Sequence, residues 1–216
     1  MMGTTIYLIR HGQSEANERG AFLGHHDLNL TQIGRKQASV TADFLCSQGQ
    51  HPNVIYSSDL MRAYETARCT AERFNMPIIK DKNLREIYAG YWENHLFTDI
   101  EVKFTESYNT WKTNIGLARC DGGESVEELQ LRIVSAVTQI AQKHKNSTVF
   151  IFTHATPIRV LAAHCLKKPL DEMKTIPWAT NASVTKVVYD NESFEMVEYS
   201  RDDFMEGIRT KLPANV

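Results

Sequence analysis

The 216-residue sequence has few cysteines and prolines, no long apolar run and no surplus of either charge. Its four cysteines lie far apart and form no C-x-x-C pair, which excludes a disulfide scaffold and a zinc knuckle. No window approaches the roughly 20 apolar residues of a membrane span. The first apolar run covers only Ile6 to Ile9 before Arg10, so we expect no signal peptide and a cytoplasmic protein.

The charge balance indicates neither a nucleic acid nor a membrane as a partner. Lys and Arg number 24 and Asp and Glu 26, a formal net charge of -2, with no block of like charge. Such a chain attracts neither nucleic acid nor a membrane surface through its overall field. An anionic small molecule would therefore need a local basic pocket.

Short apolar runs alternate with amphipathic stretches along the chain. The runs that predict strands lie at 4–9, 53–56, 77–80 and 147–153. The stretches that predict helices lie at 30–49, 60–74, 125–140 and 155–166. Candidate N-caps for the first three helices are Thr31, the polar run 57–59, and Ser125 with Glu128 as a capping box. A polar loop is expected at 12–29 and a closing hairpin at 182–199.

This alternation predicts an α/β fold with three layers, in which helices cover both faces of a mostly parallel central sheet. We expect one domain at 1–200, with a helical cap insertion at about 90–120 and a loose tail at 201–216. The segment 84–120 is rich in aromatic residues and mostly helical in pattern. It could pack on the edge of the sheet, cover a site, or do both.

The chemistry-bearing residues follow the ends of predicted strands. Arg10 and His11 follow the first strand, and His154 follows the strand at 147–153. Arg62 lies in the first turn of the helix after the second strand, and Glu86 follows in a later loop. In sheets of this type, functional residues lie just past the carboxyl ends of the strands, so these side chains should meet. Guanidinium groups bind a phosphate dianion through paired N–H groups, and a neutral imidazole can attack phosphorus.

Six segments extend this pattern over most of the chain: LIRHGQSEAN at 8–17, FLGHHDLNLTQIGRKQA at 22–38, SSDLMRAYETA at 57–67, LREIYAGYWEN at 84–94, GGES at 122–125 and THATPIR at 153–159. In these motifs and their order, the chain resembles the histidine phosphatase superfamily. The resemblance implies a phosphoglycerate mutase-like fold and a reaction on a small phosphate ester that needs neither a metal nor a cofactor.

The resemblance also implies roles for individual residues. His11 is the nucleophile that becomes a phosphohistidine, Glu86 is the proton donor, and His154 is kept protonated by the phosphate. Arg10, Arg62 and His154 form the phosphate pocket. The substrate site is lined by Arg10, Gln13, Ser14, Asn17, Leu23, Gly24, Arg62 and Ala155.

Three positions depart from the family pattern. Ala155 stands where glycine usually follows the second histidine, Leu23 replaces a polar residue, and Ala16 stands where tryptophan is frequent. We expect these changes to affect the choice of substrate more than the chemical step.

Three functions stay open. The first is a phosphatase acting on a small phosphorylated metabolite, the second a 2,3-bisphosphoglycerate-dependent phosphoglycerate mutase, and the third a non-catalytic phosphate-binding protein. The insertion lacks the adjacent arginines and the proline run of family mutases, which favours the phosphatase. The full set of chemical groups argues against the third. The sequence identifies neither the substrate nor the oligomeric state.

Several residues also have plainer interpretations. Glu86 could pair with Lys82 or Arg85 in a purely structural role. Three cations of the insertion could face solvent or meet further anionic groups on the substrate: Lys103, Lys112 and Arg119. A zinc site is a further alternative, but its histidines lack the spacing of known sites: His11, His25, His26 and His154.

Overall fold

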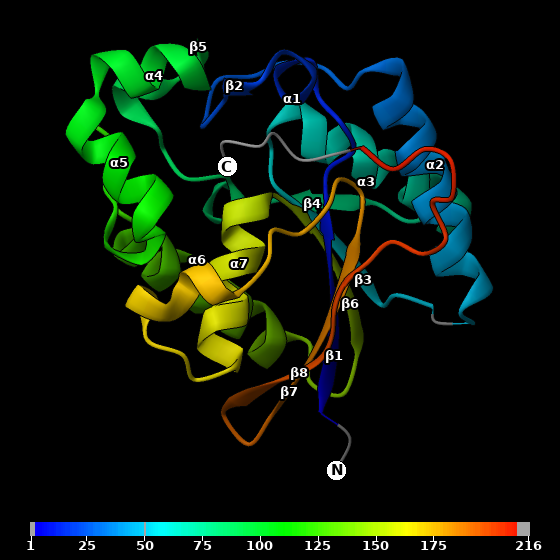
Figure 1. The fold of residues 1–216 in the computed structure, drawn as a ribbon. Helices are drawn as coiled ribbons and strands as arrows, with labels where there is room; N and C mark the ends of the chain where they lie inside the picture. The colour runs from blue at the N-terminus through cyan, green and yellow to red at the C-terminus, as the bar shows by residue number, and fades with distance from the viewer. Residues whose placement is uncertain (1–2, 50, 211–216) are drawn as a thin grey trace.

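A computed structural model describes residues 3–49 and 51–210 and places them around a six-stranded sheet of order β4-β3-β6-β1-β7-β8 (Figure 1). The sheet contains β1 (Thr4–Arg10), β3 (Val54–Ser57), β4 (Ile78–Lys80), β6 (Thr148–Thr153), β7 (Val184–Asp190) and β8 (Ser193–Arg201). The first four pair in parallel, and β7 and β8 add an antiparallel hairpin beside β1. The predicted mostly parallel sheet and closing hairpin are confirmed.

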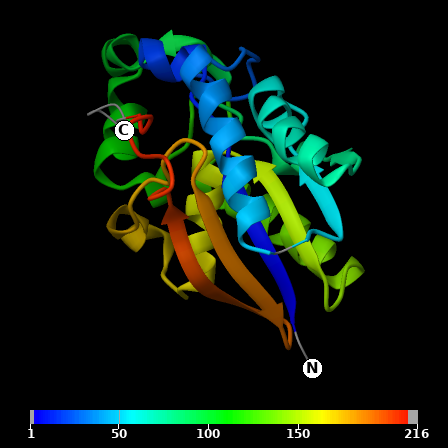
Figure 2. The ribbon, with the colours of Figure 1, turned by 90° about the vertical axis from the view of Figure 1, so that its right-hand side faces the viewer.

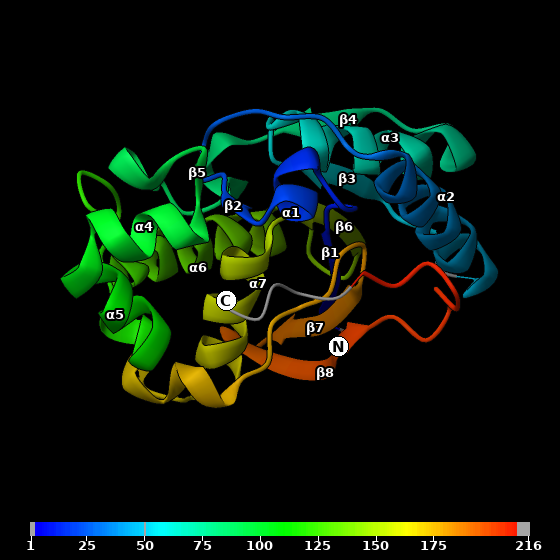
Figure 3. The same ribbon diagram turned by 45° about the horizontal axis from the view of Figure 1, so that its top comes forward.

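Helices cover both faces of the sheet. They are α1 (Glu15–Arg19), α2 (Gln32–Ser47), α3 (Met61–Phe74), α4 (Phe97–Lys103), α5 (Thr105–Thr113), α6 (Val126–Lys143) and α7 (Ala155–Cys165). α2 and α3 lie on one side, α6 and α7 on the other, and α4 and α5 lie beyond α6 (Figures 1 and 3). Figure 2 views the sheet from the side of α2. None of the helices within 3–49 and 51–210 is long and apolar enough to cross a bilayer.

The side chains of β1 alternate between the two faces, as the geometry of a strand requires. Tyr7 and Ile9 join the core beneath α2 and α3. Ile6 and Leu8 join the larger core beneath α6 and α7. Because both faces of β1 are buried, its carboxyl end is held firmly in the centre of the molecule.

Of the three N-caps predicted from the sequence, the structure confirms two. Thr31 caps α2, and Ser125 and Glu128 form the predicted capping box of α6. The cap predicted for α3 at 57–59 is wrong, because the N-cap is Leu60, which has no capping side chain, and the Met61 amide donates instead to the Asp27 carboxylate at 2.8 Å. The polar residues before it have other partners: the Ser58 hydroxyl contacts His154, and Asp59 pairs with Arg85.

Two segments differ from what the sequence indicates. The expected loop at 12–29 contains α1 and the short strand β2 (Ala21–Phe22). β2 pairs antiparallel with β5 (His95–Leu96), which ties this loop to the insertion. Strands of two residues leave no periodicity to detect. The segment 84–120 is α-helical only in α4 and α5, and 3-10 turns and β5 precede them.

The expectation of a loose C-terminal tail is wrong for residues 202–210. Phe204 stacks on Phe44 of α2 with ring centroids 4.0 Å apart, and Met205 is buried. Thr210 donates a hydrogen bond to the side chain of Asn181. The rest of the predicted tail, 211–216, lies outside the described residues.

Candidate active site

The basic residues meet at the carboxyl edge of the sheet. Arg10 pairs in register with Thr153 of β6, and the next residue in each strand is a histidine. The His11 amide continues the ladder by donating to the Thr153 carbonyl at 3.0 Å. The two histidine rings lie together, with centroids 5.2 Å apart and planes at 61°. Parallel pairing therefore brings together side chains that are 143 positions apart in sequence.

The loop after His11 is held against the start of α2 by two glycines. A Cβ on Gly12 would lie 2.3 Å from the Gly34 carbonyl oxygen, and one on Gly34 would lie 2.0 Å from the Gln13 carbonyl oxygen. Neither contact is sterically possible, so only glycine allows this close approach. The Gly12 amide also donates to the Thr66 hydroxyl of α3 at 3.1 Å. These contacts fix the backbone that carries His11.

His11 is a buried, neutral imidazole with its orientation fixed. Its side chain lies 2.7 Å from the Gly12 carbonyl through Nδ1, and a carbonyl only accepts, so Nδ1 carries the proton. Burial lowers the pKa of His11 well below 6.5, and the charges of Arg62 and Arg10 lower it further. The neutral ring therefore keeps a lone pair on Nε2, as an attacking nitrogen requires.

Arg10 and Arg62 are buried cations on the walls of the pocket. One guanidinium nitrogen of Arg10 donates to the Ala179 carbonyl at 2.6 Å. Arg62 donates to the carbonyls of Gly24 at 2.8 Å and His26 at 3.1 Å. Burial lowers the pKa of each arginine to about 10, so both stay charged at neutral pH. Since a guanidinium has five N–H donors, both retain donors for an anion.

Asn17 is oriented by hydrogen bonds on one side of its amide. Its side-chain oxygen accepts from the Ser14 amide and from Asn181, both at 3.1 Å. Asn181 also donates to the His11 carbonyl at 3.2 Å. With its oxygen engaged, Asn17 has amide N–H groups left for a ligand in the pocket.

His154 lies fully buried beside His11. Its Nε2 lies 2.9 Å from the Ser58 hydroxyl, and its Nδ1 has no partner among the described residues. Burial lowers the pKa of His154 well below 6.5, with Arg62 and His11 adding to the shift. Without a ligand this ring is therefore neutral. The protonated form expected from the sequence requires the charge of a bound phosphate.

Glu86 reaches the pocket from a segment that is anchored from behind. One carboxylate oxygen accepts from the Ile87 amide at 2.8 Å, and the other lies 3.4 Å from the Thr156 amide in the first turn of α7. Arg132 of α6 donates to the Glu86 carbonyl at 3.1 Å and pairs with Glu124 at 2.7 Å. The structural pairing of Glu86 with Arg85 considered above is not formed, because Arg85 pairs with Asp59.

The pocket between these residues encloses about 620 Å³ of empty space, part of which opens to solvent. Nearly all of the predicted site residues line it: Arg10, His11, Ser14, Asn17, Leu23, Gly24, Arg62, Glu86 and Ala155. Gln13 does not line it, because its side chain turns to accept from the Thr31 hydroxyl at 2.8 Å. His154 is likewise absent from the lining, since it lies behind the surface.

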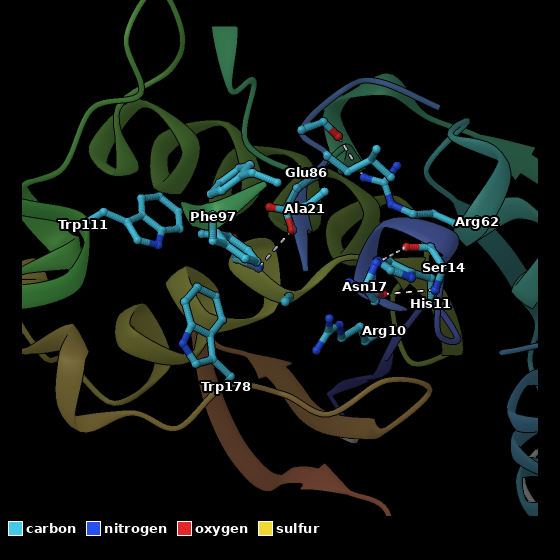
Figure 4. A pocket seen from close by; sticks show the side chains of 15 residues that line it. Arg10, His11, Ser14, Asn17, Ala21, Arg62, Glu86, Phe97, Trp111 and Trp178 are labelled. Atoms are coloured by element: carbon cyan, nitrogen blue, oxygen red, sulfur yellow. Dashed lines mark hydrogen bonds between the residues drawn. The ribbon is translucent and has the colours of Figure 1, made fainter. Parts of the chain in front are cut away.

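The sequence did not predict the residues that line the pocket on the side opposite His11. That side contains four aromatic side chains, Phe22, Phe97, Trp111 and Trp178, while Ala21 and Thr156 complete the lining. Figure 4 shows Phe97, Trp111 and Trp178 gathered opposite Arg10 and His11. Phe97 and Trp111 fall in the predicted cap. Trp178 lies in a connecting segment with no motif, so no sequence signal marks it.

The geometry offers no ready metal site in the described chain. Within residues 3–49 and 51–210, no group of three or more His, Cys, Asp or Glu side chains is arranged to hold a metal ion. His25 instead contacts the Glu86 carbonyl at 2.8 Å through Nε2. The zinc alternative therefore has no ligand set in this part of the chain.

The sequence profile of the histidine phosphatase superfamily (branch 1) matches residues 6–202. The chain belongs to this superfamily. The resemblance predicted from the six motifs is thereby confirmed.

Curated relatives support the same superfamily assignment. Phosphoserine phosphatase 1 of Hydrogenobacter thermophilus is 31% identical over 187 residues, covering 87% of each chain. Phosphoglycerate mutase-like protein 4 of Arabidopsis thaliana is 33% identical over 162 residues, covering 72% of this chain and 68% of its own.

Solved structures of this superfamily share the fold. Bacillus stearothermophilus YhfR superposes with a TM-score of 0.88 at 30% identity, covering 94% of this chain and 100% of its own. Mycobacterial glucosyl-3-phosphoglycerate phosphatase Rv2419c, solved with VO3, gives a TM-score of 0.84 at 27% identity, covering 92% and 99%. The predicted phosphoglycerate mutase-like fold is confirmed.

Proposed function

We propose that this protein is a phosphatase that hydrolyses small phosphate monoesters through a phosphohistidine on His11. The observation that carries the proposal is the state of His11, which is neutral, buried and held by its Nδ1–H beside two buried arginines. Several relatives are named as phosphatases, among them a metal-independent phosphoserine phosphatase of Arabidopsis thaliana.

The first step transfers the phosphoryl group to His11. Nε2 of His11 forms a bond to phosphorus as the bond from phosphorus to the ester oxygen breaks. Arg10 and Arg62 stabilise the charge on the phosphoryl oxygens, and the Gly12 carbonyl accepts the Nδ1–H of the ring, which becomes positive. Glu86, in its protonated form, gives its proton to the leaving alkoxide, so a neutral alcohol departs.

The second step returns the enzyme to its starting state. Glu86, now a carboxylate, accepts a proton from a water molecule that attacks the phosphohistidine. The bond between phosphorus and Nε2 breaks, and inorganic phosphate leaves with His11 neutral. The charges that assist both steps come from side chains of the protein, so the reaction needs no metal ion.

A phosphoglycerate mutase is the second candidate, because one curated relative is named phosphoglycerate mutase-like. A mutase must hold its intermediate through the substrate carboxylate while the phosphoryl group returns. Two of the three cations of the insertion are paired elsewhere, Lys112 with Glu101 and Arg119 with Glu128, and the third, Lys103, does not line the pocket. This arrangement favours hydrolysis.

We also propose that the protein acts on small molecules in the cytoplasm. Its four cysteines are all free thiols, as is usual for proteins of reducing compartments.

The test is hydrolysis of p-nitrophenyl phosphate by the wild type and by His11→Ala, with a 2,3-bisphosphoglycerate-dependent mutase assay beside it. We expect the wild type to turn over the ester with EDTA present, and His11→Ala to lose about a thousandfold or more of kcat. Unchanged activity in His11→Ala would overturn the proposal. Mutase activity exceeding hydrolysis would establish the second candidate, and phosphate binding without turnover would establish a non-catalytic protein.

A further inference from the structure

The pocket has two chemically different halves. Arg10 and Arg62 lie toward His11, the opposite half is aromatic, and Glu86 lies between the two halves (Figure 4). If the phosphoryl group occupies the cationic half, the leaving group must lie against the aromatic half. The chemistry of that half therefore selects the substrate.

We propose that this protein prefers phosphate monoesters whose alcohol is apolar and aromatic or bulky, over esters whose alcohol carries a carboxylate or an ammonium group. This inference rests on the proposed phosphatase function and specifies its substrate class. It differs from the substrates in the names of several relatives, which are an amino-acid phosphate and a phosphoglycerate derivative.

The aromatic wall is built from four separate segments that contact one another. Phe22 of β2 has its ring centroid 5.1 Å from Trp111 of α5 and 5.8 Å from Phe97 of α4. Trp178, from the segment before β7, stacks on Trp111 at 6.2 Å with the planes 26° apart. Pairing of β2 with β5 holds Phe22 beside the insertion. A wall of packed rings of this kind is formed before any ligand arrives.

Trp178 also contacts the guanidinium group of Arg159. The guanidinium carbon of Arg159 lies 4.2 Å from the centroid of the Trp178 ring. Arg159 is itself buried, and it donates to the carbonyls of Ile176 at 2.8 Å and Met173 at 3.2 Å. A cation already occupies one face of this tryptophan. A second cation, such as the ammonium of a substrate, would meet repulsion there as well as attraction to the ring.

No described residue that lines the pocket offers a counter-charge for a substrate carboxylate at the aromatic end, because Arg159 does not line the pocket and already donates to backbone carbonyls. Among the described residues that line the pocket, the only formal positive charges are Arg10 and Arg62, which the phosphate requires. Lys103, which the sequence offered as a further contact, lines a different hollow beside Asp121. A carboxylate against the wall would lose its hydration and gain no ionic partner, which costs binding energy. An apolar group gains by burial against the same surface.

The decisive experiment compares kcat/KM for esters that differ in the alcohol but not strongly in its leaving ability. We would use 2-phenylethyl phosphate, O-phosphoserine, 3-phosphoglycerate and phosphocholine at one pH. We expect 2-phenylethyl phosphate to exceed each of the other three by about tenfold or more. An equal or higher value for any of the three would overturn the inference, and a preference for phosphocholine would show that the rings bind cations. If no ester is hydrolysed, the proposed function itself fails.

Variants of Phe97 test whether the wall causes the preference. Phe97 is half-buried at the start of α4, and Phe97→Ala should lower kcat/KM for 2-phenylethyl phosphate about tenfold while changing phosphoserine less than about threefold. Phe74→Ala is the matched control, since this half-buried ring at the end of α3 packs against Phe150 of the sheet and does not line the pocket. Equal losses for both substrates in Phe97→Ala would contradict the inference. Thermal unfolding checks the folding of both variants, and the wild-type series decides the preference whether or not they fold.

Discussion

Among individual residues, Arg62 illustrates how position and chemistry combine. An arginine in the first turn of an amphipathic helix, away from the apolar stripe, is usually exposed to solvent. Arg62 is instead 1% exposed, and its guanidinium group donates to two carbonyls of a neighbouring loop. Those carbonyls, of Gly24 and His26, belong to the loop that contributes Leu23 and Gly24 to the pocket lining. The same guanidinium therefore orders the loop and places a positive charge at the proposed phosphate site.

Replacement of Arg62 by lysine tests the need for this planar group. Arg62→Lys keeps the positive charge but cannot donate to both carbonyls and to the phosphate at once. We expect kcat/KM for p-nitrophenyl phosphate to fall by about a hundredfold. Arg68→Lys, on the exposed surface of the same helix, should change it less than about twofold. A loss equal in both variants would show that Arg62 has no special role.

The protonation of His11 gives a second test. The pKa of His11 is lowered by burial and by Arg62 and Arg10, so the ring should stay neutral as the pH falls through 6.5. Nitrogen-15 NMR of the imidazole should show a protonated Nδ1 and a bare Nε2 over this range. A protonation midpoint at or above 6.5, or the opposite tautomer, would contradict the account.

At the scale of helices and strands, hydrogen bonds from α6 hold the segment that ends at Glu86 in place. Arg132 donates to the carbonyls of Asn83, Arg85 and Glu86 at 2.8, 3.0 and 3.1 Å and forms an ion pair with Glu124. Glu124 belongs to the GGES motif, in which the sequence indicates a role only for Ser125, as a helix cap. The motif thus supports the segment that presents Glu86 to the pocket.

Arg132→Met removes these contacts and should lower the free energy of unfolding by about 2 kcal/mol, because three carbonyls and Glu124 lose a charged donor. It should also lower kcat more than it changes KM, since Glu86 loses its support. Arg119→Met breaks an ion pair that is half exposed, and we expect a change within about 1 kcal/mol and normal kcat. Chemical denaturation and steady-state kinetics measure both quantities. A normal kcat in Arg132→Met would remove Arg132 from the positioning of Glu86.

The elements that sequence reasoning predicted well are those with strong local patterns. β1, β6 and α6 have continuous apolar runs or a regular apolar stripe with a capping box, and such signals survive in any tertiary context. β2 and β5 depend on a pairing between distant two-residue segments, which no local pattern reveals. The same reason explains why the strand-end residues of the site were predicted and Trp178 was not.

At the scale of the whole molecule, hydrogen bonds connect the C-terminal segment to the pocket residues. Thr210 holds Asn181, and Asn181 donates to both Asn17 and the His11 carbonyl. Residues 202–210, expected to be loose, therefore reach the loop that carries His11. The site depends on contacts from both ends of the described chain.

The two buried histidines also make global stability depend on pH. In the unfolded chain His11 and His154 would take up protons near 6.5, but in the folded protein their pKa values lie well below this. Because the unfolded state binds more protons in this range, the free energy of unfolding should fall as the pH drops below 6.5. Urea denaturation at a series of pH values measures it. His11→Asn should show a shallower dependence, and an equal slope in this variant would contradict the assignment.

The central claim is that His11 takes the phosphoryl group, and rapid quenching with a phosphorus-32-labelled ester tests it directly. With p-nitrophenyl phosphate, whose leaving group needs no proton, we expect an acid-labile, base-stable label on the peptide that contains His11. It should be present in the wild type and stronger in Glu86→Gln, whose second step lacks its base. His11→Ala should carry no label. Turnover without any label on that peptide in either enzyme, or a label on another residue, would contradict the account.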